Sequence, residues 1–196
     1  DTAEGRSGHL PVEGPGGKVN ALRDLYFLVD SYYLPGANVL ADRFVARFLP
    51  EAEAAAAKLG IEPRLLLAQA ALETGWGKSL ERAETPANNL FGIKATPSWD
   101  GARAQHWTME QGAAGLERRR EEFRAYESSE ASFGYYVNLI GNSPRYSTAV
   151  ASADDPEAYA RAISNAGYAT DTQYADKWLS IYNGTRLANA LKGVAP

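Results

Sequence analysis

Apolar side chains recur with helical spacing in the segment that starts near residue 41. Phe44, Val45 and Phe48 lead into an alanine-rich stretch that stops at Gly60. Residues three and four positions apart share a face of a helix, so this spacing predicts a helix with one buried side. Pro50 lies inside it, and we expect this proline to split the helix into two pieces or to kink it.

A second helix is predicted to begin at Pro63 and to stop at Gly75 and Gly77, in the sequence PRLLLAQAALETGWG. Proline suits the first position of a helix because the N–H that it lacks has no partner there. Glycine is common just beyond the last turn, since it readily adopts the left-handed conformation that ends a helix. The two signals define a largely apolar helix with one acidic residue, Glu73, in its last turn.

The second half of the chain combines a loop, a hairpin and further helices. Proline, glycine and asparagine interrupt residues 79–101, which predicts a long loop, and long loops in compact domains are usually functional. Strand-like segments on both sides of residues 112–115 predict a β-hairpin. Helical spacing then predicts three helices, at residues 129–141, 156–166 and 172–191.

These elements predict one mainly helical domain of α+β type over residues 41–191, with a single small β-hairpin lobe. Residues 1–40 are expected to be a linker or N-terminal arm that is partly flexible, because the segment begins with a stretch rich in glycine, proline and small polar residues. Residues 192–196 are expected to be a short tail. The 196-residue chain is 45% hydrophobic, which is enough for one buried core.

Composition restricts the chemistry that this domain can carry. The chain has no cysteine and only two histidines, His9 and His106, so thiol chemistry is excluded and a histidine metal site or a Ser/His triad is poorly supported. A formal net charge of -4 argues against a nucleic-acid partner. No apolar run reaches the roughly 20 residues that span a bilayer, so we expect no membrane insertion. Carboxylates are therefore the candidate catalytic groups.

Glu73 is the strongest chemical candidate. The C-terminal end of a helix carries partial negative charge, and Leu72 and Trp76 are apolar neighbours, so both effects are expected to raise the pKa of this carboxyl. A raised pKa is what a general acid needs near neutral pH. From these features alone, the ordinary interpretation of Glu73 as a solvated helix residue is the stronger one, since glutamate is a good helix former.

Several motifs reverse that preference. In order along roughly residues 41–191, the chain carries ALETGWGKS, NNLFGIKA, FRAYES, SFGYYVNLI, PRYSTAV and NAGYATDTQYADK. Together they resemble the glucosaminidase domain (glycoside hydrolase family 73) of bacterial flagellar and autolytic peptidoglycan hydrolases. The resemblance implies a lysozyme-like fold with a hairpin beside a substrate groove, no metal or cofactor, and hydrolysis of the β-1,4 bond after N-acetylglucosamine in peptidoglycan.

The resemblance also assigns catalytic residues. Glu73 matches the family's catalytic acid, and Tyr168 matches a tyrosine placed near the scissile bond. The family holds a second carboxylate in a Thr-x-Glu stretch on a hairpin, and Thr108-Met109-Glu110 fits that pattern, although the flanking residues differ from it. The role of Glu110 requires that it faces the groove.

Two mechanisms are open for the second catalytic group. Glu110 would activate a water molecule on the opposite face of the sugar, which gives inversion if the two carboxyl groups lie about 6.5–9.5 Å apart. Alternatively, the acetamido group of the substrate would attack the anomeric carbon, with the Tyr168 hydroxyl orienting it or stabilising charge. The sequence does not choose between these mechanisms.

A saccharide groove also needs flat apolar faces and polar side chains. The candidates for stacking on sugar rings are Trp76, Phe91, Trp107, Tyr135 and Tyr146. The candidates for binding hydroxyl and acetamido groups are Asn88, Asn89 and Lys94. Each aromatic ring could instead pack in the core, and the two asparagines could form the turn into LFGIK.

We therefore expect an endo-β-N-acetylglucosaminidase that acts on peptidoglycan glycan strands in the bacterial periplasm. Its expected task is to open the wall for flagellar rod assembly, with flagellar rod proteins as further partners. The enzymatic alternatives are a lytic transglycosylase or muramidase-type cleavage. The alternative from another class is a non-catalytic wall-binding or rod-scaffold module.

Overall fold

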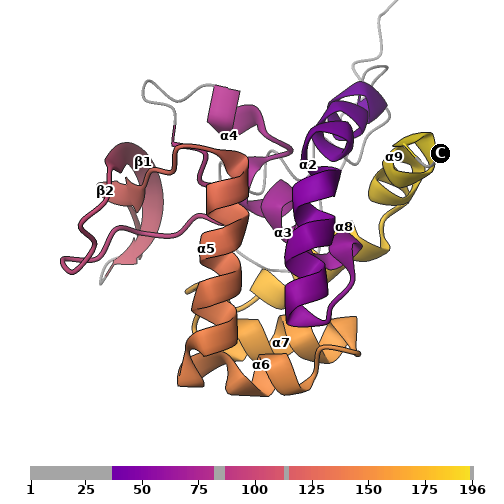
Figure 1. Ribbon diagram of the computed structural model, residues 1–196. Coiled ribbons are helices and arrows are strands. Elements are labelled where there is room, and N and C mark those ends of the chain that lie inside the picture. Colours follow the sequence, from indigo (N-terminus) through magenta and orange to yellow (C-terminus); the bar gives the residue numbers. More distant parts are fainter. Residues whose placement is uncertain (1–36, 82–86, 113–114, 195–196) are drawn as a thin grey trace, which may run out of the picture. The chain divides into compact units, whose positions relative to one another are not determined.

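The computed structural model describes residues 37–81, 87–112 and 115–194 (Figure 1). Within them the domain is mainly helical with one two-stranded antiparallel sheet, which confirms the predicted fold class. The helices are α2 (Ala37–Leu59), α3 (Pro63–Thr74), α4 (Lys78–Glu81), α5 (Ser129–Asn142), α6 (Ser147–Ala151), α7 (Pro156–Asn165), α8 (Tyr174–Asn183) and α9 (Thr185–Val194). The strands are β1 (Arg103–Gly112) and β2 (Gly115–Arg124), and a 3-10 turn, η1, spans Pro144–Tyr146.

Helix α2 is continuous through Pro50, so the proline does not split it into two pieces. Pro50 lies on the exposed side of the helix, where its ring does not have to fit into the core. Phe44 and Phe48 lie on the opposite, buried side, as the helical spacing predicts. Gly60 follows the helix with a φ of +71°, the left-handed conformation that was expected to end it.

The helix expected at residues 172–191 is instead two helices, α8 and α9, that meet at Gly184. Gly184 has an extended backbone (φ -70°, ψ 146°), which interrupts the helical path. A β-carbon at this position would lie only 2.9 Å from the carbonyl oxygen of Ser180, so glycine allows the close turn. The apolar spacing alone did not reveal this break, because both helices continue the same buried pattern.

The β-hairpin forms where the sequence predicts it. Its register pairs Arg103 with Arg124 at the open end and Gly112 with Gly115 at the turn. The loop that precedes the hairpin pairs with β2 at one position, where Lys94 forms an isolated antiparallel β-bridge with Phe123. Backbone hydrogen bonds from Ala95 to Glu122 and from Arg124 to Ile93 hold the open end of the hairpin against the loop between α4 and β1.

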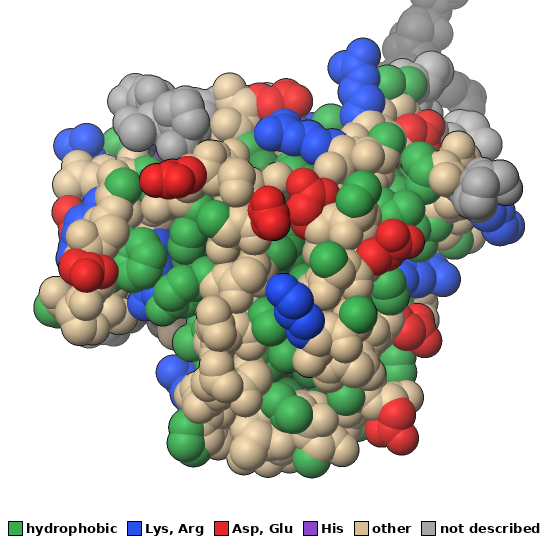
Figure 2. Space-filling view, in the orientation of Figure 1, with side chains coloured by type: hydrophobic (Ala, Val, Ile, Leu, Met, Phe, Trp, Pro, Cys, Tyr) green, Lys and Arg blue, Asp and Glu red, His purple; other side chains and the backbone are tan. Residues whose placement is uncertain are grey.

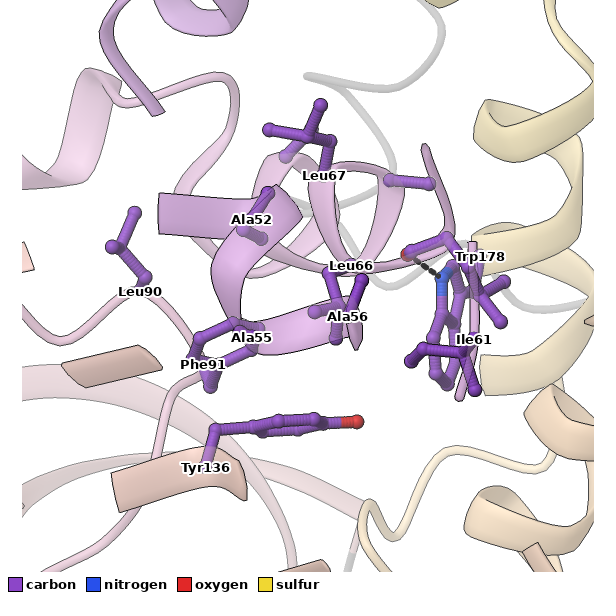
Figure 3. Close-up of a cluster of buried hydrophobic side chains, with 14 of the residues drawn as sticks. Ala52, Ala55, Ala56, Ile61, Leu66, Leu67, Leu90, Phe91, Tyr136 and Trp178 are labelled. Carbon is purple, nitrogen blue, oxygen red and sulfur yellow. Dashed lines mark hydrogen bonds between the residues drawn. The ribbon is translucent and has the colours of Figure 1, made fainter. Parts of the chain in front are cut away.

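Helix α3 supplies the centre of the core. Every residue from 65 to 71 is buried, and the helix packs against α2 on one side and α8 on the other. The indole of Trp178, on α8, donates a hydrogen bond of 2.8 Å to the carbonyl oxygen of Leu65 (Figure 3). Phe91 enters the same core from the loop, with its ring centroid 4.2 Å from that of Tyr136. Because α3 is apolar and buried on all sides, its packing fixes the position of the residues that follow Ala71 at its C-terminal end.

The boundaries differ slightly from those expected. Helix α2 begins at Ala37, inside the range assigned to the linker, and α9 extends to Val194, inside the range assigned to the tail. Residues 1–36, on which most of the linker prediction falls, lie outside the described residues.

Charged side chains of both signs are scattered over the face of the molecule shown in Figure 2, without a continuous basic surface. None of the helices in the described ranges is both long enough and apolar enough to span a bilayer.

Truncating the buried α3 helix is expected to destabilise the domain. Leu66 is fully buried, so Leu66→Ala is predicted to lower the free energy of unfolding by about 2–5 kcal/mol through lost burial and a residual cavity. Val39→Ala is the control, since Val39 on α2 is 51% exposed, and its effect is predicted to stay within about 0.5 kcal/mol. Denaturant titration measures both, and equal effects would show that α3 is not the centre of the core.

Candidate active site

Glu73 lies in the last turn of α3, as the sequence predicts. Gly75 ends the helix in the left-handed conformation, and its backbone N–H donates to the carbonyl oxygen of Ala71. The hydroxyl of Thr74 donates to the carbonyl oxygen of Ala70 at 2.6 Å and accepts from the backbone N–H of Gly77 at 2.9 Å. These bonds satisfy the end of the helix without using the Glu73 side chain, which is part-exposed.

The three residues after α3 all have positive φ angles: 57° at Gly75, 62° at Trp76 and 86° at Gly77. Glycine adopts this conformation at little cost, whereas tryptophan rarely does. Trp76 is held there by packing, because its ring is 7% exposed and the guanidinium of Arg186 lies 4.4 Å from its centroid. Strained backbone of this kind is concentrated at functional sites.

The Glu73 carboxyl is contacted from α8 and from the loop. The hydroxyl of Tyr174 donates a 2.8 Å hydrogen bond to Oε1 of Glu73. The other oxygen, Oε2, lies against Gly92, where a β-carbon would come within 2.6 Å of it. Only glycine leaves room for the carboxyl in this position.

Tyr168 lies beside Tyr174, the residue that binds Glu73. Its ring stacks on that of Tyr174, with centroids 5.9 Å apart and planes at 26°. Its hydroxyl donates to the carbonyl oxygen of Phe91 at 2.7 Å. Burial raises the pKa of Tyr168 well above its usual value, and the nearby charge of Glu73 adds to the rise. The hydroxyl therefore keeps its proton at neutral pH.

The loop that carries Tyr168 is held at both ends. The guanidinium of Arg145 donates to the carbonyl oxygens of Ala166 and Gly167, the latter at 2.6 Å. Beyond the tyrosine, Lys177 and Asp171 form a half-buried ion pair of 3.0 Å. The position of Tyr168 thus depends on side chains from η1 and α8.

Glu110 lies on β1, and the hairpin register places it opposite Glu117. Its side chain falls outside the described part of the chain. Glu110 as the second carboxylate therefore stays a prediction. Among the described residues, no group of three or more acidic or histidine side chains could hold a metal ion.

Three of the rings expected to stack on sugars are buried: Trp76, Phe91 and Tyr146. Phe91 is 0% and Tyr146 is 4% exposed, and Phe91 packs between Phe133 and Tyr136. Their rings pack in the core and offer no open face to a ligand. Trp76 is 7% exposed, and its ring packs edge-on against Phe44.

Asn88 and Asn89 form hydrogen bonds with the backbone. This agrees with the alternative interpretation, in which the two asparagines form the turn into LFGIK. The amide of Asn88 donates to the carbonyl oxygen of Tyr126 at 2.9 Å. The amide nitrogen of Asn89 donates to the carbonyl oxygens of Ile93 and Arg124, and its oxygen accepts from the N–H of Ile93. Both side chains fix the loop between α4 and β1.

The remaining candidates lie on or beside the hairpin. Lys94 is exposed, and its ammonium lies 3.6 Å from the Glu121 carboxylate. Tyr135 is half-buried, with the guanidinium of Arg124 at 4.3 Å from its ring. Trp107 is 59% exposed, so its face is the most accessible of the candidate rings.

Sequence reasoning missed Tyr174 and Gln69. Gln69 is a polar residue in a fully buried stretch of α3 and lies four positions before Glu73, which puts both on one face of the helix. Its amide nitrogen donates to the Tyr174 hydroxyl at 2.9 Å. A polar residue in an apolar helix, one turn before Glu73, was the feature from which the sequence could have identified Gln69. Nothing in the sequence identified its partner Tyr174, 105 residues away.

Comparison with known proteins connects this geometry to a family. A glucosaminidase family model, described as mannosyl-glycoprotein endo-beta-N-acetylglucosaminidase, matches residues 49–187. The chain is 46% identical over 139 residues to the peptidoglycan hydrolase FlgJ of Pseudomonas aeruginosa, covering 70% of this chain and 35% of that protein. It is also 46% identical over 141 residues to the peptidoglycan hydrolase FlgJ of Vibrio parahaemolyticus, covering 71% of this chain and 46% of that protein. The chain thus spans less than half the length of these curated relatives.

Solved structures show the same fold. A peptidoglycan hydrolase mutant from Sphingomonas sp. A1 matches with a TM-score of 0.72 and 45% identity, covering 78% of this chain and 99% of that one. The glycoside hydrolase domain of Salmonella typhimurium FlgJ, in a C-terminally truncated form, matches with a TM-score of 0.60 and 37% identity, covering 79% and 99%.

Because Gly92 packs tightly against the Glu73 carboxyl, adding a methyl group at residue 92 is expected to destabilise the domain. Gly92→Ala would place a β-carbon against Oε2 of Glu73 at a φ of +61°, so it is predicted to lower the free energy of unfolding by about 1–3 kcal/mol. Gly134→Ala, in α5 with open space around the added carbon, is the control and is predicted to stabilise the domain by about 0.5–1 kcal/mol. Thermal unfolding measures both, and a neutral Gly92→Ala would contradict the tight packing described here.

Proposed function

This chain belongs to the glucosaminidase family, and on that premise we propose that it is a peptidoglycan hydrolase that cleaves the β-1,4 bond after N-acetylglucosamine. The relatives that carry the name peptidoglycan hydrolase support the substrate class. The observation that carries the proposal in this molecule is the Glu73 carboxyl, held by Tyr174 at the end of a buried helix beside Tyr168.

Glu73 is the general acid of the proposed reaction. Cleavage of a glycosidic bond requires a proton on the leaving oxygen, since an alkoxide is a poor leaving group. Glu73 is part-exposed at a position fixed by α3, and the residue that follows Thr74 is a glycine without a side chain to obstruct approach. A glycan strand can then bring its glycosidic oxygen to the carboxyl without a rearrangement of the core.

Two groups are proposed for the other face of the sugar. Glu110 on β1 would act as the base that activates water, with the hairpin bringing it toward Glu73. In the alternative, the acetamido group of the substrate attacks, and the Tyr168 hydroxyl orients it. The hydrogen bond from the Tyr168 hydroxyl to the Phe91 carbonyl supports a polar role for that hydroxyl in either mechanism.

Sugar binding is proposed for the exposed side chains at the hairpin. Trp107 offers the most open ring, and the guanidinium of Arg118 lies 4.4 Å from its centroid. Tyr135 and Lys94 flank the base of the hairpin and are the further candidates. Trp76, Phe91 and Tyr146 support the site from behind as packed rings.

The cellular role is proposed from the relatives alone. Similarity to FlgJ proteins supports a task in opening the wall for the flagellar rod, which would place the protein in the periplasm with flagellar rod proteins as partners. The matched region covers 35% and 46% of those two relatives.

Removing the acid tests the function. Glu73→Gln keeps the shape of the side chain but cannot donate an acidic proton, so kcat on purified peptidoglycan is predicted to fall about 100- to 10,000-fold while binding to insoluble wall is retained. Mass spectrometry of the wild-type digest is expected to show reducing-end N-acetylglucosamine. Anhydromuramyl ends would indicate a lytic transglycosylase, reducing-end muramic acid a muramidase, and binding without cleavage by the wild type a scaffold module.

The hairpin carboxylate is tested by a matched pair of variants. Glu110→Gln is predicted to lower kcat about 100-fold or more with little change in KM, because a general base acts in the transition state. Glu117→Gln is the control, since Glu117 lies directly opposite on β2 and binds Arg119 at 2.9 Å. A loss confined to KM in Glu110→Gln would make this residue a binding contact, and equal small effects in both variants would leave the substrate-assisted mechanism.

A further inference from the structure

The side chains of Gln69 and Tyr174 form a buried chain of hydrogen bonds that ends on the proposed acid. Gln69 is 0% and Tyr174 is 1% exposed. The amide nitrogen of Gln69 donates to the Tyr174 hydroxyl at 2.9 Å, and that hydroxyl donates to Oε1 of Glu73 at 2.8 Å. Because Gln69 and Glu73 are four residues apart on α3, one tyrosine from α8 reaches both.

The direction of these bonds follows from the groups involved. An amide nitrogen has hydrogens to donate but accepts none, so the proton of Tyr174 is left for the Glu73 carboxyl. Burial raises the pKa of Tyr174 well above its usual value, and the negative charge of Glu73 raises it further. Tyr174 is therefore a donor throughout the pH range in which a glutamate titrates.

We propose that Tyr174, oriented by Gln69, is a positioning residue that keeps the acidic proton of Glu73 on Oε2. A carboxylic acid carries its proton on one oxygen, and Oε1 already accepts the hydrogen of Tyr174. The proton is then on the oxygen that lies against Gly92. The inference rests on the proposed function, in which Glu73 is the general acid.

The same hydrogen bond contributes to the transition state. When Glu73 gives its proton to the glycosidic oxygen, negative charge develops on its carboxylate. A hydrogen bond to an ionised acceptor is shorter and stronger than one to a neutral acceptor. The Tyr174 hydroxyl thus stabilises the transition state more than it stabilises the enzyme–substrate complex. Loss of this hydrogen bond therefore lowers kcat rather than changing KM.

Removal of one oxygen atom tests the assignment. Tyr174→Phe keeps the ring that stacks on Tyr168, and it is predicted to lower kcat about 10- to 100-fold with KM unchanged. The alkaline limb of the kcat–pH profile is predicted to move to higher pH, because the ionised carboxylate loses a donor. Tyr168 does not obscure this limb, since burial raises its pKa well above the usual value as well.

Tyr182→Phe is the matched control. Tyr182 lies on the same helix, α8, and donates a 2.6 Å hydrogen bond to Glu62, the residue that precedes α3. This variant also removes a hydrogen bond from an α8 tyrosine to a glutamate, but that glutamate lies just before the opposite end of α3. It is expected to leave kcat and the pH profile unchanged.

A second variant separates orientation from ring packing. Gln69→Leu leaves the Tyr174 hydroxyl in place without its buried donor, and it is predicted to give a smaller fall in kcat with a shift of the alkaline limb in the same direction. The inference is overturned if Tyr174→Phe matches Tyr182→Phe in kcat and pH profile, or if only KM changes. Cleavage by Glu73→Gln would instead contradict the proposed function, so the two failures are distinguishable.

Discussion

The hydrogen bond from Tyr174 to Glu73 joins the two helices on which the site depends. Helix α3 is buried along its length, so it has one position in the core and presents Glu73 at a fixed point. Helix α8 packs beside it and supplies the tyrosine that determines which way the carboxyl faces. Other features of the site are arranged around this pair, including the stacked Tyr168 and the glycine that makes room for Oε2.

Two opposing electrostatic effects meet at this carboxyl. The C-terminal end of α3 carries partial negative charge and disfavours a second negative charge beside it. The Tyr174 hydroxyl points its proton at Oε1 and favours that charge. Two loop residues also shape the site. The carbonyl oxygen of Phe91 accepts a hydrogen bond from the Tyr168 hydroxyl, and Gly92 leaves space for the Glu73 carboxyl.

The sequence predicts those features that depend on local chemistry. Pro63 and Gly75 bound α3, and the apolar spacing indicates which faces are buried, so the amino-acid sequence alone is enough to place Glu73 in the last turn. The helix break at Gly184 is not predictable in this way, because a backbone turn leaves no mark on apolar spacing. Aromatic residues are the hardest to assign: a ring that packs in the core and a ring that stacks on a sugar have the same sequence signal, and Phe91 and Tyr146 are buried. Tyr174 was missed because its partners lie about a hundred positions away in the sequence.

Neutron diffraction from a deuterated crystal grown at acidic pH locates the acidic proton of Glu73 directly. We predict a deuteron on the Tyr174 oxygen directed at Oε1 of Glu73, and the acidic deuteron on Oε2 against Gly92. An acidic deuteron on Oε1 directed at Tyr174 would contradict this assignment, because Oε1 would then donate to Tyr174 instead of accepting from it.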